Sequence, residues 1–287
     1  MKDRLTEIGF AAGWRLIRIL PLPVARRLFN AAADRAYRKN GPGTQRLRKN
    51  LAHVVPDLPD RMVRDALRSY ARYWLEAFRL PSQNKQQFLQ GFAMSDEHYD
   101  WLKTGMAEGT GVIMALPHLA NWDAAGAWVS ANGWPMATVV ERLKPEGVFR
   151  QFVAYRESLG MEVIPTAGGE RSPLDALADR LTQGWMVCLL GDRDLSRRGI
   201  EVTFFGGRTR MPAGPAILAI RTGAPLYAAD LFFEPTRTFA VLTRIVPPTE
   251  GALDERVRAT TQMLADSYAA GIAKHPQDWH MLQKLWL

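Results

Sequence analysis

The residues best suited to chemistry lie in one short stretch, ALPHLANWD, at residues 115–123. His118 follows the apolar run GVIMALP, which is typical of a buried strand, and Asp123 comes five positions later as a helical pattern begins. Pro117 favours an extended conformation in the residue before it, so the histidine is expected where the strand ends. A carboxylate bonded to one imidazole nitrogen fixes the tautomer and leaves the other nitrogen free to accept a proton. The stretch therefore predicts a general base, and the alternative is a structural histidine beside a capped helix.

Polar side chains also follow other predicted strands. Glu141 ends one strand, Asp192 and Arg193 follow another, and Arg210 follows a third, IEVTFF. Ligands of open α/β sheets gather at the carboxyl ends of strands. We therefore expect these groups near His118.

Other chemistries find little support in the sequence. Cys188 lies within the apolar run WMVCLL, which predicts a buried thiol. The remaining histidines show no metal-ligand spacing, and His280 in WHMLQ is expected to be packed and hydrogen-bonded. No GxGxxG follows a strand, and neither a P-loop nor a GxSxG elbow occurs. We therefore expect no metal and no redox cofactor, and direct attack assisted by a base rather than a covalent enzyme intermediate.

Composition bounds the class of protein. The 287 residues are 47% hydrophobic and 23% charged, as in ordinary globular chains. The single cysteine excludes an internal disulfide and fits a reducing compartment. No 18-residue apolar stretch occurs, and the first residues lack the order of a signal peptide. These features predict a cytoplasmic protein that does not span a membrane.

The charge is concentrated in the first 80 residues, which hold 17 Lys and Arg against 7 Asp and Glu, whereas the rest hold 20 against 22. Residues 5–39 predict two amphipathic helices separated by the Pro-Leu-Pro of residues 21–23, and residues 60–80 predict a third. Arginine and tryptophan around an apolar face are typical of a helix in a membrane interface. The alternatives are helices that cap the core and, with no zinc-finger or RRM signature, a nucleic-acid binder.

After residue 100 the pattern alternates between strand and helix, which indicates an α/β protein with a central mixed sheet flanked by helices and an amphipathic helical N-terminal region. We expect one domain over 1–287, with 1–100 a mainly helical membrane-docking region and 101–287 the catalytic core. The expected strands are 111–117, 136–141, 161–165, 185–190, 200–205, 225–234 and 237–246, the last two as a hairpin. The expected helices are 123–132, 145–159, 172–183, 213–222 and 254–274.

The chain resembles the lipid A biosynthesis (lauroyl/myristoyl) acyltransferase superfamily, in which PHLANWD matches a His-x4-Asp/Glu motif. It is more similar to the branch of phosphatidylinositol mannoside acyltransferases. The segments that carry this resemblance run in order from about residue 11 to 283: AAGWRLIR, SYARYWLEAFRLP, ALPHLANWDAAGAW, VVERLKPE, FVAYRESLG, AGGER, GDRDLSRRG, FFG, TRMPAGPAILAIRTGA and DWHMLQ.

The resemblance implies transfer of an acyl group, typically palmitoyl, from acyl-CoA to the 6-hydroxyl of a mannose on a phosphatidylinositol mannoside. It also implies a peripheral enzyme at the cytoplasmic face of the plasma membrane. The rival acceptors within the superfamily are another glycolipid or a lysophospholipid. Partners would be acyl-CoA, an anionic glycolipid and the membrane surface, with no nucleic acid.

By the same resemblance, His118 is the general base and Asp123 the motif acid, while Glu141 and Arg156 bind the polar headgroup. From its place after a strand, Arg210 is a further expected substrate-binding residue. Asp192 stands where relatives carry a glutamate that is thought to orient the histidine. Whether Asp123 or the shorter Asp192 orients His118 is left open by the sequence.

Overall fold

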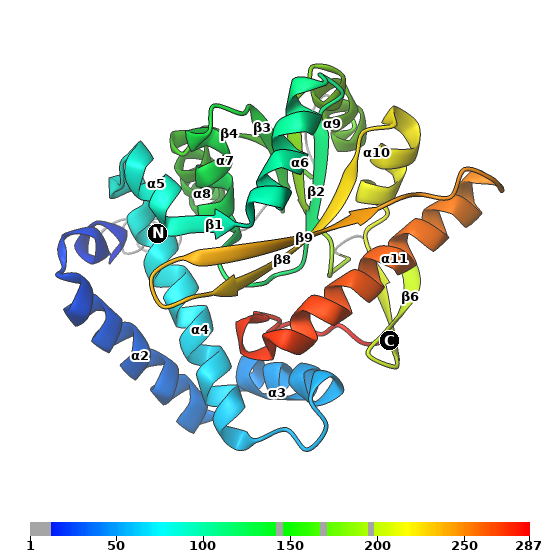
Figure 1. The fold of residues 1–287 in the computed structure, drawn as a ribbon. Helices are drawn as coiled ribbons and strands as arrows, with labels where there is room; N and C mark the ends of the chain where they lie inside the picture. Colours follow the sequence, from blue (N-terminus) through cyan, green and yellow to red (C-terminus); the bar gives the residue numbers. More distant parts are fainter. Residues whose placement is uncertain (1–12, 142–145, 167–170, 195–197) are drawn as a thin grey trace.

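The computed structural model describes residues 13–141, 146–166, 171–194 and 198–287. It shows a mixed α/β fold, as the alternating pattern predicts (Figure 1). The elements are α2 (Leu22–Lys39), α3 (Pro42–Val54), α4 (Asp60–Arg79), η1 (Leu80–Ser82), α5 (Lys85–Gly91), β1 (Phe92–Met94), α6 (Asp96–Ala107), β2 (Val112–Leu116), α7 (Trp122–Ala131), β3 (Met136–Val140), α8 (Glu146–Ser158), β4 (Met161–Pro165), α9 (Pro173–Thr182), β5 (Met186–Leu190), β6 (Ile200–Phe204), β7 (Gly207–Met211), α10 (Gly214–Thr222), β8 (Leu226–Phe233), β9 (Thr238–Ile245), α11 (Leu253–Lys274) and η2 (Pro276–Asp278).

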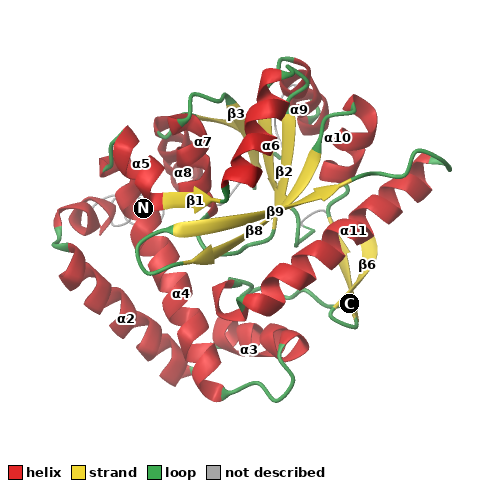
Figure 2. Ribbon diagram, in the orientation of Figure 1, coloured by secondary structure: helices red, strands yellow, loops and turns green. Residues whose placement is uncertain are grey.

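A seven-stranded sheet in the order β1-β9-β8-β2-β5-β3-β4 forms the centre of the molecule (Figure 2). Strands β8, β2, β5, β3 and β4 are parallel, while β9 is antiparallel to β8 and β1 follows the direction of β9. The predicted hairpin is confirmed as β8 and β9, and the sheet is mixed as expected. All five residues of β2 are buried, because helices cover a parallel sheet on both faces.

The helices before the sheet differ in part from the sequence expectation. Residues 13–19 are helical and the chain bends before α2, as the Pro-Leu-Pro predicts, while the start of the first expected helix lies outside the described residues. Trp14 is buried, and its Nε1 donates to the carbonyl oxygen of Phe78 on α4. It therefore packs inward, whereas Leu16 and Ile19 are exposed.

The third expected helix of this region, α4, packs into the core, with Val63, Leu67 and Leu75 among its buried residues. Its arginines serve internal contacts: Arg68 pairs with Asp34 of α2, and Arg72 pairs with Glu76 one turn on. Helix α2 lies alongside α4 on the outside of the molecule (Figure 1). No helix in the described part of the chain is long and apolar enough to cross a membrane.

The sequence pattern failed to predict α3, α5, α6, β1 and the second strand of the small sheet, β7. Strand β7 pairs antiparallel with β6, and the turn between them consists of Phe205 and Gly206, both with positive φ. This conformation matches a two-residue type I′ turn. The small hairpin lies apart from the main sheet, so the residues that follow β6 are not at its carboxyl edge.

Local caps explain where several helices begin. Asn121 accepts a hydrogen bond from the backbone nitrogen of Ala124 and caps α7, as expected, and Asn84 forms a capping box on α5. Ser172 stands at the N-cap of α9 but makes no capping hydrogen bond there, so Pro173 at the first helical position is the local helix-start signal.

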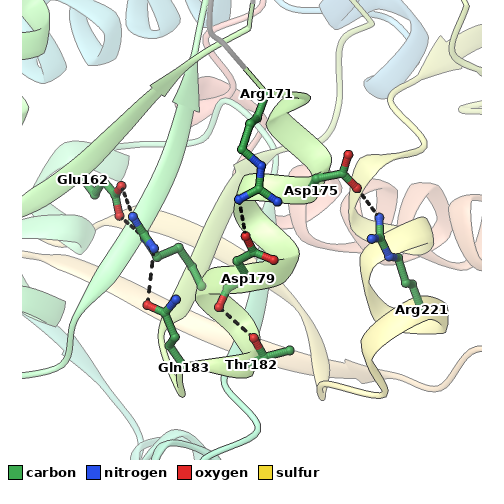
Figure 3. A network of polar contacts seen from close by, with 8 residues as sticks. Glu162, Arg171, Asp175, Asp179, Thr182, Gln183 and Arg221 are labelled. Carbon is green, nitrogen blue, oxygen red and sulfur yellow. Dashed lines mark hydrogen bonds and ion pairs between the residues drawn. The ribbon is translucent and has the colours of Figure 1, made fainter.

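Ion pairs attach α9 to its neighbours β4 and α10 (Figure 3). Arg180 of α9 donates to both carboxylate oxygens of Glu162 on β4, and Arg221 of α10 pairs with Asp175 of α9. Because these side chains are partly exposed, each pair contributes roughly 0–1 kcal/mol. They orient α9 but do not reach the candidate site.

Candidate active site

His118 and Asp192 meet because their strands are neighbours in register. Strands β2 and β5 are parallel, with Leu116 beside Leu190, so the residue two positions beyond each strand lies at the same edge of the sheet. His118 Nδ1 lies 2.6 Å from Asp192 Oδ1, and the backbone nitrogen of His118 donates to Oδ2 at 3.0 Å. The carboxylate thus holds both the ring and the backbone of His118.

Asp192 is kept as an acceptor for these bonds. Its side chain is fully buried, and Trp279 Nε1 donates to its Oδ2 at 2.9 Å. Burial by itself raises the pKa of Asp192, but the charge and hydrogen bonds of His118 and the bond from Trp279 outweigh burial and leave the pKa below its ordinary value. An ionised Asp192 accepts the proton of Nδ1, so Nε2 of His118 is the nitrogen free to act as a base.

The other carboxylate of the motif, Asp123, has different partners. Its Oδ1 accepts from Arg156 Nε at 2.8 Å and its Oδ2 from the Tyr73 hydroxyl at 2.9 Å. Burial by itself lowers the pKa of Arg156, but the charge of Asp123 outweighs burial, so the pKa is raised above its ordinary value and the guanidinium stays charged. Asp123 therefore positions Arg156 of α8 and Tyr73 of α4, while Asp192 holds the histidine.

A segment near residue 280 fixes the loop that carries His118. The backbone nitrogen of His280 donates to the carbonyl oxygen of His118 at 2.8 Å, and the carbonyl of Asp278 accepts from Ala120 at 2.9 Å. Ala120 has a φ of 44°, a left-handed conformation that costs free energy in residues other than glycine. These backbone bonds hold the loop in that conformation, a role that the sequence did not reveal.

His280 itself is packed and hydrogen-bonded, as expected. Its Nε2 lies 3.0 Å from the Ser69 hydroxyl, which donates to Asp278 Oδ1 at 2.7 Å. Burial, and then the nearby His118, lower the pKa of His280 to about 3, so the ring is neutral at physiological pH. His280 therefore places no positive charge beside His118.

A cavity of about 420 Å³ begins at His118 and runs beneath α7 along the sheet. Its polar end contains His118, Asp123, Glu141, Arg156 and Arg193, whereas its interior is apolar. The volume lies within the usual range of small-molecule sites, roughly 300–1,000 Å³.

Methionines line the inner part of this cavity. Met136, Met161 and Met186 are the first residues of β3, β4 and β5, at the edge of the sheet opposite His118. The cavity therefore extends over about the length of a five-residue strand, ~16 Å. Unbranched methionine side chains adapt to a flexible apolar ligand.

The structure places Arg210 and Cys188 differently from the sequence expectation. Arg210 is exposed on β7 and is not among the residues that line the cavity, because β6 and β7 form their own sheet. Cys188 is shielded from bulk water but lines the cavity, and burial raises the pKa of its thiol to about 12. It therefore stays a neutral thiol.

Three other lining residues were not among the predicted substrate-binding residues. Trp122 stacks on Tyr73, with ring centroids 4.1 Å apart, and presents its edge to His118. Arg193 is half-buried at the polar end, directly after Asp192. Its place directly after a strand was the sequence signal for a residue of the site.

Within the described residues no cluster of three metal-ligating side chains occurs.

A base–carboxylate pair at the mouth of an apolar cavity suits the transfer of an acyl group to a hydroxyl. Residues 4–287 match the bacterial lipid A biosynthesis acyltransferase family, and the chain belongs to it. It is similar to the phosphatidylinositol mannoside acyltransferase of Mycolicibacterium smegmatis, with 48% identity over 99% of this chain and 92% of that protein. The protein of the same name from Mycobacterium tuberculosis is 45% identical over 98% of this chain and 89% of its own length.

Proposed function

We propose that this acyltransferase moves a long acyl group, palmitoyl in the first instance, from acyl-CoA to the 6-hydroxyl of a mannose on a phosphatidylinositol mannoside. The observation that carries the proposal is the single cavity that joins His118 to a deep apolar interior. The relatives' names supply the acceptor class. The same cavity gives the acyl chain a place away from water while its thioester stays beside the base.

The mechanism uses a ternary complex. His118 Nε2 removes the proton of the sugar hydroxyl as its oxygen attacks the thioester carbonyl, while Nδ1 remains bonded to Asp192. The tetrahedral intermediate then expels the CoA thiolate, which takes the proton from His118. The ester bond forms and the thioester bond breaks, so the base returns to its starting state.

Cationic side chains supply positive charge at the polar end. Arg193 is half-buried beside the His118–Asp192 pair, where it offsets the negative charge that develops on the thioester oxygen. Arg156, neutralised by Asp123, presents hydrogen-bond donors to the sugar headgroup, and Glu141 offers an acceptor to its hydroxyls.

We further propose that the protein docks peripherally on the cytoplasmic face of the membrane. Residues 16–28 expose five large apolar side chains, with exposed fractions of 37–78%: Leu16, Ile19, Leu22, Val24 and Leu28. Arg26 and Arg27 lie among them. Apolar side chains mixed with arginines suit the headgroup region of an anionic bilayer.

The test combines purified protein with labelled palmitoyl-CoA and, in separate reactions, phosphatidylinositol mannoside, another glycolipid and a lysophospholipid. We expect transfer to the mannoside, and a loss of at least about 10²-fold in His118→Ala with an unchanged fold. Transfer to another acceptor alone would reject the proposed substrate. Near-normal transfer by a folded His118→Ala protein would reject the proposed base.

A further inference from the structure

A second apolar groove, of about 620 Å³, lies between α2 and α4. Helix α2 contributes small side chains that keep it open, and α4 contributes aromatic ones. The groove is lined among others by Phe29, Ala33, Ala36, Ala71, Trp74 and Phe78. Neither the base nor any polar group proposed to act in the reaction lines it.

The groove is separated from the His118 cavity by one layer of side chains. Tyr70, Trp74 and Leu282 line both spaces. A molecule that places a hydroxyl at His118 therefore has this second apolar space just beyond the wall of the site. The donor's chain already has a place in the inner cavity, so the groove is available to the other substrate.

The helix over the groove carries positive charge without internal partners. Arg26, Arg27, Arg35, Arg38 and Lys39 lie on α2, and all five are exposed. In the part of the chain that the structure describes, none of the five forms an ion pair, and Asp34 of the same helix pairs with Arg68 instead. Lys39 also lines the groove itself. An apolar groove below a cationic helix is complementary to a lipid with acyl chains and an anionic phosphate.

We infer that this groove binds an acyl chain of the acceptor lipid while its headgroup reaches His118. The inference rests on the proposed function, since it takes the acceptor to be an acylated anionic lipid. The apolar lining of the groove matches an acyl chain, which stays out of water as it passes from the bilayer into the groove. The groove thus selects acceptors by their lipid tail, separately from the sugar that the active site reads.

The kinetic test fills the groove without touching the catalytic residues. Ala36→Phe and Ala71→Phe place a ring in the groove, because both alanines are half-buried and line it. Ala31→Phe is the matched control, since Ala31 is exposed on α2 and does not line the groove. Each variant is assayed with the full diacyl mannoside and with its deacylated, water-soluble headgroup.

We expect Ala36→Phe and Ala71→Phe to raise KM for the diacyl acceptor at least tenfold and to leave kcat/KM for the soluble headgroup within twofold of the parent. Ala31→Phe should match the parent with both acceptors. An unchanged KM for the diacyl acceptor would overturn the inference, and so would an equal loss with both acceptors. Vesicle co-sedimentation of all variants separates lost groove binding from lost membrane docking.

A second measurement needs no turnover. A mannoside with a diazirine near the end of one acyl chain is photo-crosslinked to the parent protein in vesicles, and the modified peptides are mapped. Adducts in residues 29–44, which line the groove and not the His118 cavity, would support the groove if excess unlabelled mannoside removes them. Adducts confined to the strands of the inner cavity, or to residues 16–28, would refute it. Adducts in residues 29–44 of a protein that fails to transfer acyl groups would count against the proposed function but would still support lipid binding in the groove.

Discussion

Asp192 Oδ1 lies 2.6 Å from His118 Nδ1, although 74 residues separate the two in the sequence. The carboxylate nearer in sequence, Asp123, binds Arg156 and Tyr73 instead. The two residues of the His-x4-Asp motif thus have separate roles. His118 pairs with Asp192, which follows the neighbouring strand β5, and Asp123 links side chains of α4 and α8. This division makes the two aspartates separable by mutation.

Asp192→Asn should lower kcat by roughly 10²–10⁴ with little change in fold, because an amide neither fixes the Nδ1–H tautomer nor stabilises the charged ring. Asp192→Glu retains the charge and should recover part of the lost rate. Steady-state kinetics with thermal melting checks both variants. Equal rates in the Asn and Glu variants would show that the carboxylate charge is not required.

Asp123→Asn should act on stability first. It leaves the buried Arg156 guanidinium without its counter-charge, which typically costs about 3–5 kcal/mol of unfolding free energy. Asp175→Asn is the control, since its pair with Arg221 is exposed and should cost less than about 1 kcal/mol. Urea unfolding at one pH compares the two. Similar losses in both variants would contradict a buried role for Asp123.

Met136→Phe should shift the preferred donor towards shorter acyl chains. Met136 lies at the end of the cavity away from His118, so a rigid ring there shortens the space for the chain. Met263→Phe, a partly exposed site on α11 that does not line the cavity, is the matched control. The measurement is kcat/KM over a series of acyl-CoA lengths. A parallel fall at every length would contradict the assignment of this space to the acyl chain.

His280 should make the protein acid-sensitive. Its pKa is near 3 in the folded protein and about 6.5 when unfolded, so the unfolded state binds more protons between these values. Stability therefore falls as pH is lowered through this window, by up to about 1.4 kcal/mol per pH unit. In His280→Gln this contribution is absent. The difference in unfolding free energy between parent and variant, measured from pH 3 to 8, should vary with pH; a constant difference would disprove the prediction.

Asp230 should have the opposite pH dependence. Burial raises its pKa to about 7, partly offset by Lys274, and its Oδ1 has no hydrogen-bond partner in the described residues. Between about pH 4 and 7 the folded state keeps a proton that the unfolded chain releases. The free energy of unfolding therefore falls as pH rises through this range. Asp230→Asn should be more stable than the parent at pH 8, by up to about 4 kcal/mol, and similar to it near pH 4.

The comparison for Asp230 is Asp278→Asn. Asp278 accepts hydrogen bonds from Ser69 and from the backbone nitrogen of Phe233, so the amide places a donor where an acceptor is needed. That variant should lose about 1–3 kcal/mol at pH 8. Thermal or urea unfolding at pH 4 and pH 8 distinguishes the two sites, and a gain in both variants would contradict the predicted difference.

The sequence predicted the features that depend on residues close to one another along the chain. The apolar run before His118 gave the strand, Asn121 gave the cap of α7, and the alternation of strands and helices gave the sheet class. Helical spacing found α4 within one residue but left open whether the core or a membrane covers its apolar face, because spacing reveals an apolar face and not what covers it.

Contacts between segments that are far apart in the sequence could not be predicted from it. That β2 and β5 are neighbours decides that Asp192 reaches His118, and a sequence pattern carries no strand order. The same holds for Trp279 and Asp278, which reach the site from another part of the chain. The hairpin of β6 and β7 was missed because Phe205 adopts a positive φ that only this turn imposes, and Arg210 was assigned to the site as a result.

The bonds from Trp279 and His280 to Asp192 and His118 also govern when the site comes into being. Strands β2 and β5 precede residues 278–280 in the chain, so Asp192 lacks its donor Trp279, and the His118 loop lacks its backbone partners, until those residues have been synthesised. A nascent chain, or a product truncated before residue 278, therefore keeps the direct His118–Asp192 contacts but lacks the three hydrogen bonds that support them. The His118–Asp192 pair has all of its supporting hydrogen bonds only on a chain synthesised at least that far.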